Sequence, residues 1–75
     1  MMKIRLPERN IDKTLTLDLK ASIKHYGQMQ AIVLDRTGYI IDGLHRYVAM
    51  KELGRKTIKA NVYDGTLSGN LRIKL

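Results

Sequence analysis

The stretch from residue 39 to residue 50, YIIDGLHRYVAM, changes its character over the single dipeptide Asp42-Gly43. Residues 39–41 favour a β-strand, and the residues after the dipeptide are typical of a helix. Glycine has no Cβ, so the main chain at such a junction can approach a bound anion closely, and a helix N-terminus offers unpaired N–H groups. The stretch therefore predicts a strand–turn–helix unit with a phosphate-binding site where the helix begins.

Other segments alternate between apolar and polar residues, as strands do. Alternation predicts strands at residues 3–6 and 57–63. The segment 30–41 predicts a hairpin, because its DRTG sequence supplies the residues that a type I turn prefers between two apolar runs. Residues 66–75 form either a last strand or a flexible tail.

Two segments have helical spacing. The first helix is predicted from about residue 16 to residue 26, with Thr14 or Thr16 as its cap, and a strand is the competing prediction for its first residues. Its inner face would consist of Leu15, Leu19, Ile23 and Tyr26. The second helix is predicted over residues 43–54, where Gly54 ends it.

The element order is therefore β-α-β-β-α-β, with a further strand if the C-terminal residues pair. This order predicts one small α+β domain over residues 1–75, in which the helices pack on a mixed sheet. A chain of this length buries only about 60% of the surface that its unfolded form exposes. Formation of a homodimer would add stability.

The charge of the chain favours a polyanionic partner. Fourteen Lys and Arg face seven Asp and Glu, which gives a net charge of +7. Excess charge of this size repels itself and attracts nucleic acid, nucleotides or acidic lipid; the alternative is a solvated surface with no partner. The predicted DNA-binding residues are Lys20, Lys24, Arg55, Lys56 and Lys59.

Cysteine and long apolar runs are both missing from the sequence. Without cysteine the chain has no disulfide and no thiolate metal site, and two histidines are too few to indicate zinc. No run approaches the roughly 18 apolar residues of a membrane span, and the N-terminus does not resemble a signal peptide. We expect a cytoplasmic protein with no metal site of its own and no membrane contact.

Three side chains near Gly43 suit phosphate chemistry. Arg46 falls in the first helical turn and can donate two hydrogen bonds to phosphate oxygens. His45 can donate to another oxygen or act as an acid or base, and Asp42 can cap the helix or hold a metal ion. Each residue also has a purely structural interpretation, as a turn residue, a cap or a solvated cation. The common phosphate motifs GxxxxGK and GxGxxG are absent.

Two blocks of the sequence, LKASIKHYGQMQAIVLD and IIDGLHRYVAMKELG, resemble the ParB/sulfiredoxin-like superfamily. The first is similar to the ParB pattern of a helix ending in Ser-Ile, a glycine and a Gln-Pro-Ile strand, although Ala31 replaces the proline. The second is similar to the ParB Gly-x-Arg-Arg-x-x-Ala box and, more closely, to the sulfiredoxin Gly-Cys-His-Arg box. The resemblance extends from Ile4 to about Tyr63 and implies the ParB/sulfiredoxin-like fold.

The resemblance also implies a nucleotide site. In ParB proteins the box holds the triphosphate of CTP, and in sulfiredoxins the His-Arg pair holds ATP phosphates. It implies that CTP or ATP binds here with Mg²⁺. The implied nucleotide-binding and phosphate-binding residues are Gly43, Leu44, His45, Arg46, Gly27, Gln28 and Gln30. Leu44 stands where sulfiredoxin has its cysteine, so sulfiredoxin chemistry is not expected.

The sequence leaves more than one class of function open. The first hypothesis is a nucleotide-phosphate-binding module that acts with DNA, with NTPase or DNase activity carried by Asp42 and His45 as catalytic candidates. The second is a non-enzymatic, basic DNA-binding or regulatory protein that keeps the fold without the chemistry. A third is a subunit whose basic face meets an acidic protein. Few carboxylates accompany Asp42 in the sequence, and nuclease sites normally gather two or more around metal.

Overall fold

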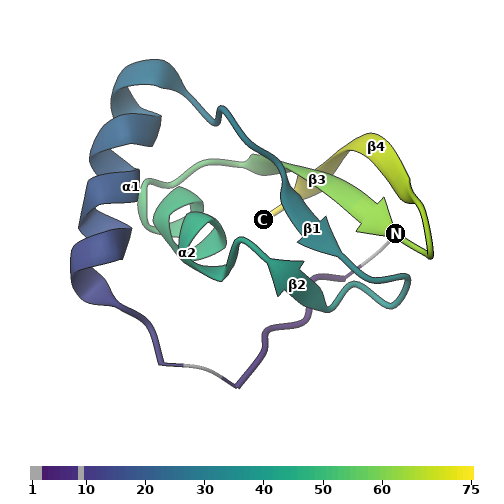
Figure 1. The fold of residues 1–75 in the computed structure, drawn as a ribbon. Coiled ribbons are helices and arrows are strands. Elements are labelled where there is room, and N and C mark those ends of the chain that lie inside the picture. The colour runs from purple at the N-terminus through teal and green to yellow at the C-terminus, as the bar shows by residue number, and fades with distance from the viewer. Residues whose placement is uncertain (1–2, 9) are drawn as a thin grey trace.

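The computed structural model describes residues 3–8 and 10–75 as two helices and one four-stranded mixed sheet (Figure 1). The elements are α1 (Lys13–Tyr26), β1 (Ile32–Leu34), β2 (Ile40–Asp42), α2 (Leu44–Glu52), β3 (Thr57–Tyr63) and β4 (Leu67–Lys74). The strand order is β2-β1-β3-β4, α2 packs against the sheet, and α1 packs on α2. The predicted α+β class is confirmed. Neither described helix is long and apolar enough to cross a membrane.

The sheet buries one face through its register. β1 and β3 are parallel, and Ile32 lies opposite Ala60 while both are fully buried. β4 runs antiparallel to β3 and places Ile73 opposite Ile58 in the same core. Residues 58, 60 and 62 are all buried, so the alternation that predicted a strand at 57–63 does mark its inward face. Apolar residues at every second position fill the layer between the sheet and α2.

The N-terminal end of the sequence differs from prediction, whereas the C-terminal end adopts one of its two predicted forms. The strand predicted at residues 3–6 is wrong, because only Arg5 forms a bridge, to Tyr39 at the outer edge of β2. The N–H of Arg5 donates to the carbonyl of Gly38 at 2.7 Å, and the carbonyl of Arg5 accepts from Ile40 at 2.9 Å. This segment covers an edge that would otherwise expose unpaired backbone groups. At the other end β4 (Leu67–Lys74) forms, so the strand is the one of the two alternatives for residues 66–75 that the structure adopts.

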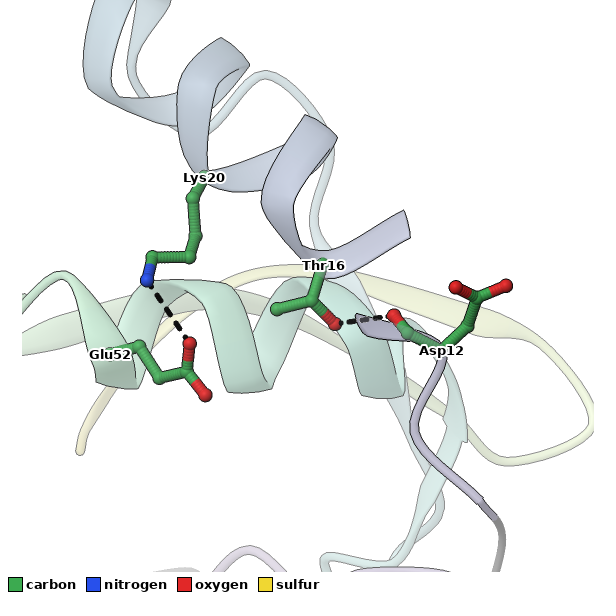
Figure 2. Close-up of polar contacts among 4 residues, drawn as sticks. All are labelled: Asp12, Thr16, Lys20 and Glu52. Atoms are coloured by element: carbon green, nitrogen blue, oxygen red, sulfur yellow. Dashed lines mark hydrogen bonds and ion pairs between the residues drawn. The ribbon is translucent and has the colours of Figure 1, made fainter. Parts of the chain in front are cut away.

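Helix α1 begins earlier than predicted and buries a narrower face. Its cap is Asp12, whose Oδ1 accepts from the N–H of Leu15 at 3.1 Å, and neither Thr14 nor Thr16 takes that role. The Thr16 hydroxyl instead donates to the Asp12 carbonyl at 2.9 Å and is buried (Figure 2). Because α1 packs mainly on α2, the predicted inner residues Leu15 and Tyr26 are 44% and 69% exposed.

An ion pair also joins the two helices. Lys20 of α1 lies 3.2 Å from the carboxylate of Glu52 at the end of α2 (Figure 2). Ile23 of α1 is buried in the core, and Leu19 is partly buried and packs against this core. The contacts of α1 therefore come from a stripe that includes Thr16 and Ile23 rather than the full predicted face.

The predicted turn at residues 35–38 is confirmed, and its carboxylate accepts several hydrogen bonds within the turn. The N–H of Gly38 donates to the carbonyl of Asp35 at 3.0 Å. Asp35 Oδ1 accepts from the Thr37 hydroxyl at 2.7 Å and from the N–H of Tyr39 at 3.0 Å. The Thr37 hydroxyl, followed by the Tyr39 N–H, lowers the pKa of Asp35.

We expect this lowered pKa to make acid destabilise the domain. Because the folded pKa lies below the unfolded value, the contribution is fully present above the ordinary Asp pKa of about 4 and is lost as pH falls through the folded value. Asp35→Asn should remove this part of the pH dependence. The measurement is the free energy of unfolding in urea between neutral pH and acid for both proteins. Equal acid sensitivity in the two proteins would contradict the assignment.

Candidate functional site

Helix α2 begins at a glycine whose surroundings leave little room for a side chain. Gly43 is the N-cap, with φ of 97°, a region that favours glycine. A Cβ there would lie 2.7 Å from Ile32 Cγ2 and 3.1 Å from the Ile32 Cα. The missing side chain therefore lets α2 pack closely on β1. That it also makes room for an anion stays a prediction. Asp42 is the last residue of β2 and does not cap α2, so that predicted role is wrong.

The first turn of α2 has no side-chain cap. This differs from α1, where Asp12 occupies the corresponding position and accepts a hydrogen bond. The free N–H groups and the positive end of the helix dipole are available to an anion. They adjoin an open hollow of about 240 Å³. It is lined by Leu15, Leu19, Asp42, Gly43, Leu44, His45 and Arg46.

A second hollow, of about 380 Å³, shares Leu19 and Arg46 with the first. Its other lining residues are Ser22, Ile23, Gly27, Met29 and Gln30. The two hollows adjoin along α1, and we call them together the Arg46 cleft. The part at the start of α2 has charged residues, and the part near the end of α1 has mostly apolar ones. This division suits a ligand with a charged end and a flat apolar end.

Arg46 connects the two parts of the cleft. Its side chain is half-buried, and its Nη2 donates to Gln30 Oε1 at 3.1 Å. Gln30 precedes β1 and Arg46 lies on α2, so the contact joins the two sequence blocks that carry the resemblance. One edge of the guanidinium is held in place, which reduces the entropy that it would lose on binding a ligand.

His45 is fixed at the edge of the cleft. Its Nε2 accepts from the main-chain N–H of Asp12 at 2.9 Å, so this nitrogen carries no proton in the contact. The bond joins the beginnings of α1 and α2 and gives His45 a structural role. Nδ1 remains for contact with a ligand.

The other predicted nucleotide residues, Gly27 and Gln28, shape the loop between α1 and β1. Gly27 ends α1 with φ of 78°, and its N–H donates to the carbonyl of Ile23 at 2.7 Å. Gln28 Oε1 accepts from the N–H of Lys59 at 2.7 Å, while its Nε2 donates to the Lys59 and Gln30 carbonyls at 3.0 and 2.9 Å. The Gln28 amide is thus committed to the main chain and holds the loop against β3.

The predicted DNA-binding residues separate into two groups. Lys20 is paired with Glu52, and Lys24 is exposed in the last turn of α1. Arg55, Lys56 and Lys59 instead line one hollow of about 240 Å³. Arg72 lines it too, and sequence reasoning missed this residue because β4 was not assigned a register that would have placed it beside Lys59.

Possible metal ligands are sparse around the Arg46 cleft. The carboxylate of Asp42 lines its polar part. Within the described residues, no group of three or more His, Asp or Glu side chains is placed to hold a metal ion. Any cation here would therefore need oxygens from a ligand as well as Asp42, an arrangement that Mg²⁺ commonly adopts with nucleotide phosphates.

Comparison with known proteins identifies one family. The chain matches the family model for the ParB N-terminal domain over residues 2–75. It is 35% identical over 52 residues to the uncharacterized protein ORF326b of Acidianus two-tailed virus. The aligned part covers 69% of this chain and 16% of the viral protein, so the chain spans about one sixth of that relative. No solved structure matches the chain.

Proposed function

Because the chain belongs to the ParB N-terminal domain family, we propose that it is a DNA-associated module that binds a nucleoside triphosphate. The phosphates occupy the polar part of the Arg46 cleft, and the nucleoside occupies the apolar part. The observation that carries the proposal is the position of Arg46, which lines both parts and is oriented by Gln30.

The polar part of the cleft offers three kinds of contact to a phosphate group. The uncapped first turn of α2 supplies N–H donors and a partial positive charge of about half a unit. Arg46 supplies a planar pair of donors. His45 Nε2 is engaged with Asp12, and Nδ1 has no hydrogen-bond partner among the described residues, so it can make a further contact. Together these groups favour a ligand with several phosphate oxygens.

Asp42 makes the site dependent on a cation. Its carboxylate lines the same part of the cleft and would repel a triphosphate that carried no metal. A Mg²⁺ ion held between Asp42 and the phosphate oxygens would remove this repulsion. The residues present fit such an ion, and its chemistry would be to neutralise phosphate charge. We therefore propose Mg²⁺ as part of the bound form.

The apolar part suits a nucleoside. Met29 lies there with 75% of its surface exposed, and a flexible thioether adapts well to the face of an aromatic base. CTP and ATP both fit this description, and the choice between them is a matter for measurement. Binding is the core of the proposal, and hydrolysis of nucleotide or DNA by Asp42 and His45 is a separate test.

The experiment is isothermal titration calorimetry with CTP, ATP and GTP, each with and without Mg²⁺, at moderate salt. We expect one saturable site for at least one nucleotide, with affinity that falls when Mg²⁺ is omitted. If no nucleotide gives heat under any condition, the proposal is wrong. The protein would then be a DNA-binding or regulatory protein without a nucleotide, which the basic hollow at Arg55 and Lys59 favours.

A further inference from the structure

Two cations lie directly opposite each other on the last two strands. Lys59 on β3 pairs with Arg72 on β4 in the antiparallel register. The neighbouring pair, Ile58 and Ile73, is buried in the core and fixes this alignment. Like charges at directly opposite positions destabilise a sheet. The register therefore brings together two positive charges that repel each other.

Two more cations adjoin this pair. Arg55 and Lys56 lie just before β3 and line the same hollow of about 240 Å³ as Lys59 and Arg72. We call the hollow that these four cations line the basic hollow. The cations lie just before β3, on β3 and on β4, and Figure 1 shows where these two strands lie in the fold. All four cations are exposed to solvent.

No acidic residue lines the basic hollow, and its four cations form no ion pair within the part of the chain that the structure describes. The ion pairs found there join Lys20 to Glu52 and Arg36 to Asp64, and neither involves the basic hollow. The Lys59 ammonium contacts the main-chain carbonyl of Gln28 at 3.3 Å, which orients it without neutralising it. The repulsion would be relieved by an anion from outside the chain.

We propose that the basic hollow binds the phosphodiester backbone of DNA, at a site separate from the Arg46 cleft. This inference rests on the DNA association in the proposed function and identifies the surface that carries it. DNA presents phosphates at regular intervals, so one strand can contact several cations at once. Ile23 and Gly27 line both the basic hollow and the apolar part of the Arg46 cleft, which makes the two sites neighbours.

The chemistry of the basic hollow specifies how it would bind. Flexible lysine and arginine side chains on an exposed surface contact phosphates and carry no direct sequence information. Binding should therefore depend little on DNA sequence. Each phosphate contact should release counterions and add about 0.9 to the slope of log affinity against log salt concentration.

The test is the double variant Lys59→Gln/Arg72→Gln, with binding to a short DNA duplex measured by fluorescence anisotropy from about 0.05 to 0.2 M salt. We expect an affinity loss on the order of tenfold or more at 0.1 M salt and a slope reduced by about 2. Without DNA and at low salt, the variant should unfold at the same or a higher temperature than wild type, because the like-charge pair is gone. A loss of DNA binding with undiminished stability cannot come from unfolding.

The matched control is Lys3→Gln/Lys13→Gln, which removes the same charge from exposed residues that do not line the hollow. Its affinity for DNA should fall much less. Equal losses in the two variants, or no DNA binding by wild type at any salt concentration, would overturn the proposal. Tighter binding to a poly-glutamate peptide than to DNA would do the same and indicate an acidic protein partner. The double variant and wild type should bind nucleotide equally in calorimetry, because the two substituted residues lie outside the Arg46 cleft. The DNA measurement needs no nucleotide, so it still tests this proposal if nucleotide binding fails.

Discussion

Arg46→Ala is expected to lower the affinity for nucleoside triphosphate by about 100-fold or more, because charged hydrogen bonds to phosphate contribute about 1.5–3 kcal/mol each. Arg46 is half-buried and donates to Gln30, and it takes part in no ion pair within the described residues. Its removal should change the free energy of unfolding by less than about 1 kcal/mol. Calorimetry measures the binding, and urea unfolding measures the stability.

Two further variants sharpen this prediction. Arg46→Lys keeps the charge but loses the planar pair of donors, so its affinity should lie between those of wild type and alanine. Gln30→Ala keeps Arg46 but removes the hydrogen bond that orients its guanidinium. It should therefore weaken nucleotide binding less than Arg46→Ala does. This graded series distinguishes phosphate recognition by the guanidinium from a general effect of charge.

Arg36→Ala is the matched control. Arg36 is exposed and lies 3.4 Å from the carboxylate of Asp64, an exposed pair of the kind that contributes little to stability. Like Arg46→Ala, the Arg36→Ala variant removes one positive charge, but at a residue that does not line the Arg46 cleft. Nucleotide affinity unchanged in Arg46→Ala, or reduced equally in Arg36→Ala, would rule out the proposed site. If Arg46→Ala only reduces DNA affinity slightly, Arg46 acts as one surface cation among several.

Gly43→Ala is expected to destabilise the domain by about 2–5 kcal/mol. The left-handed φ of 97° costs a non-glycine residue about 1–2 kcal/mol. The added Cβ would also lie 2.7 Å from Ile32 Cγ2 and 3.1 Å from its Cα, and overpacking in a core costs about 1–3 kcal/mol more. Ile32 is fully buried, so it has little room to move away. Small domains have only about 5–15 kcal/mol of stability, so a large fraction would be lost.

Gly54→Ala separates the two causes. Gly54 also has a left-handed φ, of 74°, but a Cβ there would meet nothing within 4 Å. This variant should therefore lose only the backbone contribution of about 1–2 kcal/mol. Urea unfolding followed by circular dichroism gives both values. Similar losses in Gly43→Ala and Gly54→Ala would show that the contact with Ile32 does not limit the position.

Local structure was the part of this fold that sequence reasoning predicted well. The turn at 35–38, the alternating strand at 57–63 and the helix that follows Gly43 all depend on residues a few positions apart. Local backbone preference and the periods of strand and helix are visible in such short windows. The start of α1 was predicted less well, because Asp12 and Thr14 are both acceptable caps by composition.

The candidate site was predicted only in part, because sequence reasoning sees residues that are close along the chain and not the contacts between distant segments. The strand–glycine–helix junction and Arg46 were visible in one continuous stretch, and the resemblance indicated the loop around Gln30. The partner of His45, however, is the main chain of Asp12, 33 positions away. A side chain that looks suited to acid–base chemistry in sequence can thus be engaged in a structural bond that only packing creates.

The sequence by itself determined the order of the elements from α1 to β3, the excess of positive charge and the glycine at the start of α2. The tertiary structure alone decided which atoms lie together: Gly43 against Ile32, and Lys59 opposite Arg72. Composition and local periodicity act within one segment and are the same however the segments pack. Contacts between segments depend on the register of the sheet and on the placement of the helices, which are set by burial of the whole core at once.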